Sequence, residues 1–531
     1  MTLQNILTKI RRLSGVTALA FLALQSIDAQ AAAPGITGPS FDLSAAPSYI
    51  SQPDGASVYS WGYGCRSAPT GFAPAAVGGA NCPTMQIPGP TLIVHEGDLV
   101  TVTLTNNLPA AAGNTSILFP GFAMQPYTDG VGGMLTREAA PGGGVTYRFV
   151  ATKAGTHAYY SGTQSDLQIE MGLFGALVVL PNTVPAGCRG VAATLPDGQT
   201  DFRLAAAAYD HSATCYDREY LFQFSEMDPG IHTQAEAQAA MPCTEPGGCM
   251  SIDTEPYHPA YFLINGRSMP DTIDPNYTPA YPRQPYNANP HLHPGERVLI
   301  RMVGTGRWQH PFHEHANHLR MLARDGNLLV SQTDATKLAG RLLFTTTSTP
   351  GQSMDAMFYW SGKGLNWDAY GHTSTGPGSV YNIDPSDTLH ASYNGQPVQC
   401  VPDANGYYTA DPLAPNYYEW CEDHLKALEN KPFGAVGAGG PMTLPDPNIL
   451  ADGPWYGGSA YLGVDATTRA VGGTPIPPSG TVGNSPTDEA GFAYMWHSHN
   501  EREITTNNVF PGGMMTMMLV DPQTYVIDES N

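Results

Sequence analysis

Short runs of alternating apolar and polar residues, separated by turns rich in glycine and proline, recur along most of the chain. Residues 91–95 and 99–106 follow a Pro-Gly-Pro turn and flank Glu-Gly-Asp, and residues 261–273 and 292–306 repeat this rhythm around a Pro-Gly turn. A period of two places alternate side chains on opposite faces of a strand, so these runs predict half-buried β-strands.

The predicted strands form two groups. The first group ends at Pro181. The second group begins near Asp201, and its last strands lie only around residues 489–522. We therefore predict an all-β chain of two sandwiches, residues 45–182 and residues 200–362 with 489–522. Residues 363–488, rich in Gly, Pro, Tyr and Asn, are predicted to be a loop-rich insertion, with a small third domain as the alternative.

Composition agrees with this architecture and excludes some partners. Only 13% of the 531 residues are charged, while glycine (58) and proline (47) are abundant, as expected for strands joined by many turns. A formal net charge of −22 repels phosphate backbones, so nucleic acid is excluded as a partner. The chain has no uninterrupted run of about 18 apolar residues, so no membrane span is predicted.

The first 31 residues are typical of a secretory signal peptide. Lys9, Arg11 and Arg12 precede an apolar stretch at 13–24, and Ala29-Gln30-Ala31 resembles a cleavage site. We therefore expect a secreted or periplasmic protein, in which an even number of cysteines indicates disulfides. Pairing of sequence neighbours would join 65 to 82, 188 to 215, 243 to 249 and 400 to 421, although the sequence leaves the connectivity open.

Four histidines form the strongest candidate site. His313 and His315 are two residues apart on one predicted strand, and His497 and His499 are two apart on another. Each pair shares a face, and four imidazoles would converge if the strands adjoined. Neutral imidazole suits copper, zinc, iron and nickel. The alternative is a set of hydrogen-bonded polar histidines without a metal.

Three motifs together resemble the multicopper oxidases, the laccase-like family built from Greek-key cupredoxin sandwiches. They are the Pro-Gly-Pro-Thr…Glu-Gly-Asp opening, His-Pro-Phe-His-Glu-His at 310–315, and Trp-His-Ser-His followed by Gly-Met-Met. The resemblance implies tandem cupredoxin-like sandwiches, copper and oxidoreductase chemistry. It also implies homotrimers with sites between subunits, as in two-domain members, and leaves the small-molecule or metal-ion substrate unknown.

The departures from the family pattern are specific. Ser498 stands where the family has the type 1 copper cysteine, and Glu503 stands where it has a histidine, so that His310 and a methionine at 514 or 515 are all that remain of that set. In the first domain, Leu118, Pro120, Tyr160 and Gly162 stand where the resemblance places four further histidines.

These losses predict a reduced site with no type 1 copper. We expect one ion, copper or alternatively zinc, at His313, His315, His497 and His499, with His310 as a further candidate. The leading hypothesis is an exported copper-binding oxidoreductase. The alternatives are a non-catalytic copper-binding or assembly protein, and a hydrolytic zinc site with Glu501 or Glu503 as base. His291 and His293 are interpreted as loop residues.

Overall fold

The computed structural model describes residues 33–360 except 196–197 and 294–295, the strand pairs at 392–393, 396–397 and 458–461, and residues 491–529 except 522–525. The predicted signal peptide, the cysteines at 400 and 421 and most of the predicted insertion lie outside the described residues. No helix within the described ranges is long and apolar enough to cross a membrane.

The first sandwich consists of two sheets in the strand orders β3-β2-β6-β9 and β10-β11-β5-β1-β4. Parallel pairing of β2 with β6 and of β5 with β11, beside antiparallel neighbours, requires Greek-key crossovers between the sheets. The strands are β1 Gly35–Thr37, β2 Ser40–Ser51, β3 Ser57–Cys65, β4 Phe72–Ala73, β5 Leu92–His95, β6 Leu99–Asn106, β9 Gly144–Val150, β10 Gly155–Tyr160 and β11 Phe174–Leu180, with a separate hairpin of β7 Val131–Gly132 and β8 Arg137–Glu138.

The second sandwich pairs an inner sheet, β13-β12-β15-β21-β17-β18 with β19 beside β17, with an outer sheet, β14-β26-β25-β16-β20 with β24 beside β25. The inner strands are β12 Arg218–Met227, β13 Tyr261–Ile264, β15 Arg297–Gly304, β17 Leu319–Arg324, β18 Asn327–Leu328, β19 Leu342–Leu343 and β21 Ser353–Tyr359. The outer strands are β14 His291–Leu292, β16 His310–Glu314, β20 Thr345–Ser348, β24 Gly458–Tyr461, β25 Gly491–Ser498 and β26 Met515–Val520.

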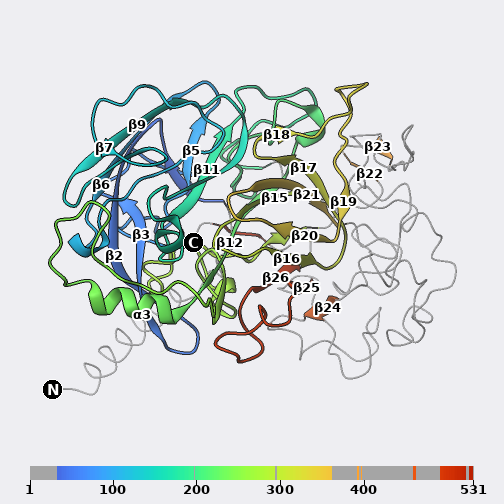
Figure 1. Cartoon of the computed structure of the whole chain (residues 1–531). Coiled ribbons are helices and arrows are strands. Elements are labelled where there is room, and N and C mark those ends of the chain that lie inside the picture. Colours follow the sequence, from blue (N-terminus) through green and yellow to red (C-terminus); the bar gives the residue numbers. More distant parts are fainter. Residues whose placement is uncertain are drawn as a thin grey trace, which may run out of the picture.

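The remaining elements are short. They are α2 Ser165–Gln168, α3 Pro229–Gln238, the 3-10 turns η1 Ala110–Ala112, η2 Ser212–Thr214 and η3 Asp271–Ile273, and the strand pair β22 Ser392–Tyr393 and β23 Gln396–Pro397. The all-β prediction, with two tandem cupredoxin-like sandwiches, is therefore confirmed. Figure 1 shows the first sandwich, in blue and teal, beside the second, in green to red.

The two sandwiches stack, which places the outer sheet farthest from the first sandwich. Ala158 and Ala176 on β10 and β11 pack against Leu221 and Val303 on the outward face of the inner sheet. Asp355 on β21 fixes this contact by accepting hydrogen bonds from the backbone nitrogen (3.0 Å) and hydroxyl (2.6 Å) of Thr156. The order of layers is thus first sandwich, inner sheet, core and outer sheet.

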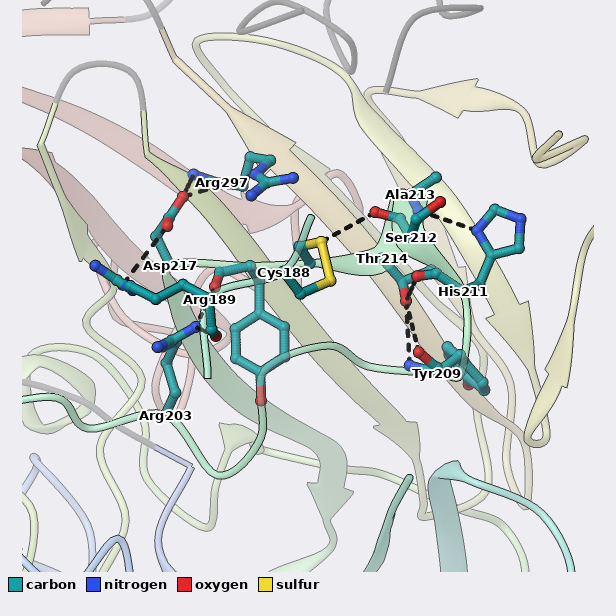
Figure 2. Close-up of a disulfide and its surroundings, with 12 residues drawn as sticks. Cys188, Arg189, Arg203, Tyr209, His211, Ser212, Ala213, Thr214, Asp217 and Arg297 are labelled. Carbon is teal, nitrogen blue, oxygen red and sulfur yellow. Dashed lines mark hydrogen bonds and ion pairs between the residues drawn. A yellow bond between two sulfur atoms is a disulfide. The ribbon is translucent and has the colours of Figure 1, made fainter. Parts of the chain in front are cut away.

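Three of the four neighbouring cysteine pairs are joined in the described residues, at Cys65–Cys82, Cys188–Cys215 and Cys243–Cys249. Figure 2 shows Cys188–Cys215 near Asp217, whose carboxylate lies 3.8 Å from the guanidinium of Arg189 and 3.7 Å from that of Arg297. This disulfide and these ion pairs hold the segment between the sandwiches against the start of β12 and β15.

Candidate metal centre

The four predicted histidines are brought together by the pairing of β16 with β25. The strands are antiparallel, with His313 opposite His497 and Phe312 opposite Ser498. Phe312 and Trp496 belong to the buried core between the two sheets. Because side chains alternate along a strand, His313 and His497 project from the outer sheet in the opposite direction, and His315 and His499 follow them two residues further on.

The imidazole rings of this histidine cluster (His313, His315, His497 and His499) lie within reach of one another. Ring centroids are 4.7 Å apart for His313 and His315, and 5.0 Å apart for His313 and His499. The His497 centroid lies 5.2 Å from that of His315 and 5.4 Å from that of His499. Rings bound to one tetrahedral ion would have centroids about 5 Å apart, given a metal–nitrogen distance of about 2.0 Å.

One pair of donor atoms already has the separation that a shared ion requires. Nε2 of His315 lies 3.2 Å from Nε2 of His497, and two nitrogens on one tetrahedral ion lie about 3.3 Å apart. Across the described part of the chain, however, no group of three or more His, Cys, Asp or Glu side chains is arranged to hold an ion as it stands. A complete site would therefore require the imidazole rings to change orientation.

Neighbouring groups orient two of the rings through their Nδ1 atoms. Nδ1 of His497 lies 2.7 Å from the carbonyl oxygen of Ser498, so it carries the proton and leaves Nε2 as the lone-pair atom. Nδ1 of His313 lies 2.9 Å from the hydroxyl of Thr345 on β20. Burial lowers the pKa of both imidazoles, and the neighbouring histidines also help to lower that of His313 to about 4. Both rings are therefore neutral at neutral pH.

The histidine cluster lies at a partly open surface. His313, His315 and His497 are buried, whereas His499 is exposed. The ring of Phe344, which is 47% exposed, stands edge-on to His313 with centroids 5.7 Å apart. Phe344 also stands edge-on to His318, at 5.3 Å. Among the described residues, the cluster is therefore most exposed on the side of His499 and Phe344.

His310 lies apart from this cluster, on the inward face of the outer sheet. Its Nδ1 is 3.0 Å from Oε2 of Glu503, and its Nε2 is 3.0 Å from Oε2 of Glu226 on β12. Burial alone would lower the pKa of His310, but the interactions with Glu226 and Glu503 outweigh it and raise the pKa to about 9. Nε2 of His310 makes a hydrogen bond with Glu226, whereas Nδ1 meets Glu503 as an ion pair. An imidazolium has no ring lone pair for a metal.

Ser498 and Glu503 belong to the same buried network as His310. The Ser498 hydroxyl donates to Oε2 of Glu503, and Nδ2 of Asn500 donates to Oε1 at 2.9 Å. Glu503 therefore faces inward, on the opposite side of the sheet from the histidine cluster, and is not placed to act as a base there. Glu501, two residues earlier, is exposed.

Sequence reasoning missed Glu226 as the second partner of His310. Strand β12 reads REYLFQFSEM, in which Tyr220, Phe222 and Phe224 enter the core. Glu226 occupies the next inward-facing position of the same strand. A carboxylate at such a position of an apolar strand is a signal that the sequence contained. Its Oε1 also accepts a hydrogen bond from the backbone nitrogen of Trp308 at 2.9 Å.

The four first-sandwich positions where the resemblance expected histidines lie far from the cluster. Leu118 pairs with Tyr160 beside β10, on the side of the inner sheet. A side chain at Gly162 would place its Cβ 2.7 Å from Cγ of Leu118, so that leucine fills the space. Because the inner sheet and the core separate these positions from the outer face, they cannot complete the site within one chain.

The loop interpretation is wrong for His291, whereas His293 does lie in the segment that follows β14. His291 belongs to β14 and is buried, with Nδ1 2.6 Å from Oδ2 of Asp521. His293 is buried too, with Nδ1 3.2 Å from Oε1 of Glu296. Because buried polar groups are normally hydrogen-bonded, each imidazole lies beside a carboxylate. These contacts are structural and lie at the edge of the outer sheet.

Part of the chain is similar in sequence to known copper proteins. Residues 79–183 match the family model described as "Multicopper oxidase". A "Multicopper oxidase MCE" of Talaromyces pinophilus is 41% identical over 98 residues, which cover 18% of this chain and 15% of that protein. A "Copper-containing nitrite reductase" of Alcaligenes xylosoxydans xylosoxydans is 33% identical over 130 residues, covering 24% of this chain and 33% of that protein.

Each of these matches spans a third or less of the relative's length. Among solved structures, a blue copper oxidase from Nitrosomonas europaea aligns over 90% of this chain and 85% of its own, at 15% identity and a TM-score of 0.43.

Proposed function

We propose that this chain is an exported member of the multicopper oxidase family that binds one copper ion at the histidine cluster and has no type 1 copper. The proposal rests above all on one observation. Two His-x-His pairs project from the same face of adjoining strands, with the Nε2 atoms of His315 and His497 3.2 Å apart.

The donor set fits a single ion better than the several coppers of the family. Four imidazoles satisfy one tetrahedral or tetragonal ion of copper or zinc. A second ion would need donors from the first sandwich, where Leu118 and Gly162 provide none and face another part of the molecule. Thr345 and the Ser498 carbonyl hold the rings, and a copper ion bound there would supply one-electron redox chemistry.

Metal analysis tests this proposal directly. The purified chain, reconstituted separately with copper and with zinc and then desalted, is expected to retain about one ion per chain by mass spectrometry. A ratio near four would overturn the reduced site, and retention of no ion would favour a protein without a metal. Greater retention of zinc than copper from an equimolar mixture would favour the zinc alternative.

Oxidoreductase activity is the first functional candidate, and a non-catalytic copper-binding protein is the second. The second is favoured by the His310 network, because Glu226 and Glu503 occupy the ring nitrogens that an electron-entry copper would use. Oxygen consumption by the copper-loaded protein, with phenols or reduced metal ions as electron donors, separates the two. Sustained consumption above the rate of free copper supports an enzyme, and its absence supports a binding role.

The position of the cluster also supports assembly. It lies on the layer farthest from the first sandwich, so any group from a first sandwich that reaches it must come from another chain. Together with the resemblance to two-domain members of the family, this leads us to propose a homotrimer in which neighbouring chains cover the cluster. Light scattering after size-exclusion chromatography should give three times the chain mass, and a monomer at micromolar concentration would contradict this.

A further inference from the structure

A cavity of about 220 Å³ lies between the two sandwiches, on the opposite side of the second sandwich from the histidine cluster. Tyr160 and Ile169 line it from the first sandwich, and Thr305, Gly306, Pro350 and Gly351 line it from two turns of the second. A space at the junction of two domains is a common position for a small-molecule site. None of the candidate metal ligands contributes to it.

The wall of the cavity offers a single free polar side-chain group. The Thr305 hydroxyl already donates to the carbonyl oxygen of Phe224 at 2.6 Å. The Tyr160 hydroxyl has no hydrogen-bond partner among the described residues, and Tyr160 is half-buried. Burial raises the pKa of Tyr160, and Asp325 raises it further, so the hydroxyl stays neutral. The cavity therefore presents apolar surface, one neutral hydroxyl and no charged side chain.

Two glycines with positive φ form part of the cavity wall, and the one at Gly351 leaves room in front of the Tyr160 hydroxyl. At Gly306, with φ of 75°, a Cβ would lie 2.3 Å from Oε2 of Glu226. At Gly351, with φ of 77°, a Cβ would lie 3.2 Å from the Tyr160 hydroxyl oxygen. A side chain at either position would be strained, and one at Gly351 would occupy the space in front of the hydroxyl.

We propose that this cavity binds a small uncharged molecule consisting of one ring with one hydrogen-bonding substituent. Its volume suits a single substituted ring, since an apolar cavity of about 150 Å³ accepts benzene. The absence of charged side chains from the lining favours an uncharged ligand, because a buried charge would have no partner there. The ring packs against Ile169 and Pro350, and the substituent exchanges a hydrogen bond with Tyr160.

Two matched probes test the proposal. Benzyl alcohol and toluene have the same ring, but only the alcohol can bond to Tyr160. We expect saturation-transfer NMR to detect both on the full chain, with the alcohol bound more tightly. Tyr160→Phe should weaken the alcohol about tenfold and change toluene affinity less than about twofold, consistent with the loss of one hydrogen bond. Tyr49→Phe, at an exposed tyrosine on β2, is the control and should change neither.

Filling the cavity provides an independent check. Ile169→Trp should abolish binding of both probes while the circular dichroism spectrum and melting temperature of the protein stay close to the wild type. Failure of wild-type protein to bind either probe would overturn the proposal. Equal weakening of both probes by Tyr160→Phe, or unchanged binding in a folded Ile169→Trp variant, would also overturn it.

Discussion

Nδ1 of His310 lies 3.0 Å from Oε2 of Glu503, and both side chains are completely buried. With Glu226 on the other ring nitrogen, the imidazolium joins the inner sheet to the loop that follows β25. A buried charge held between two carboxylates is costly to break, because either partner left alone would be an uncompensated charge.

The first prediction concerns stability against pH. The folded pKa of His310, about 9, is above its ordinary value of 6.5, so the protonated ring contributes stability that is complete below about pH 6.5. That contribution is lost as the pH rises through about 9. The shift corresponds to roughly 3 kcal/mol. Urea denaturation of the wild type should show this fall in unfolding free energy between pH 6.5 and 9.5.

Glu503→Gln should remove much of that pH dependence. The variant is expected to lose roughly 1–3 kcal/mol at pH 6.5 and to approach the wild type at pH 9.5. Glu501→Gln, at an exposed position on the same loop, should behave like the wild type. A Glu503→Gln deficit that is constant with pH would mean that His310 is not held as an imidazolium.

The second prediction concerns the metal ligands. His313→Ala combined with His499→Ala removes one imidazole from each strand, and retained copper should fall from about one ion per chain to less than about 0.1. His95→Ala combined with His258→Ala, at two exposed histidines outside the cluster, should retain the wild-type amount. Equal retention by both double variants would place the copper elsewhere.

The third prediction concerns the spectrum of the copper-loaded protein. Intense blue absorption requires a thiolate ligand, and Ser498 offers a hydroxyl that donates to Glu503. Electron paramagnetic resonance should therefore show a type 2 signal with nitrogen ligands. Ser498→Cys alone should remain without the blue band, because Glu503 still occupies Nδ1 of His310. An intense blue band in the wild type would show that a thiolate reaches the metal.

The fourth prediction concerns processing and oxidation. Mass analysis of the exported protein should place its first residue near Ala32 and find no free thiol before reduction, in accordance with four disulfides. Peptide mapping should recover Cys188 linked to Cys215 and Cys243 linked to Cys249. An unprocessed N-terminus, or reactive thiols on all eight cysteines, would contradict export through an oxidising compartment.

Relations within one strand follow from the sequence. His313 and His315 share a face because the backbone repeats every two residues, and the same holds for His497 and His499. Local turns and alternation likewise predicted the all-β sandwiches, and three neighbouring cysteine pairs are confirmed. These features depend on backbone geometry over a few neighbouring residues, and such local geometry can be predicted from the sequence.

Relations between distant segments became evident from the folded chain. His313 pairs with His497 across β16 and β25, and His310 contacts Glu226 on β12. The histidine cluster lies on the side of the second sandwich that faces away from Leu118 and the first sandwich. Strand register and the order of layers are fixed by which apolar faces are buried against each other, and that depends on the whole chain at once. A spacing of two residues places two side chains on the same face of a strand, but the packing of the whole chain determines which residues that face contacts.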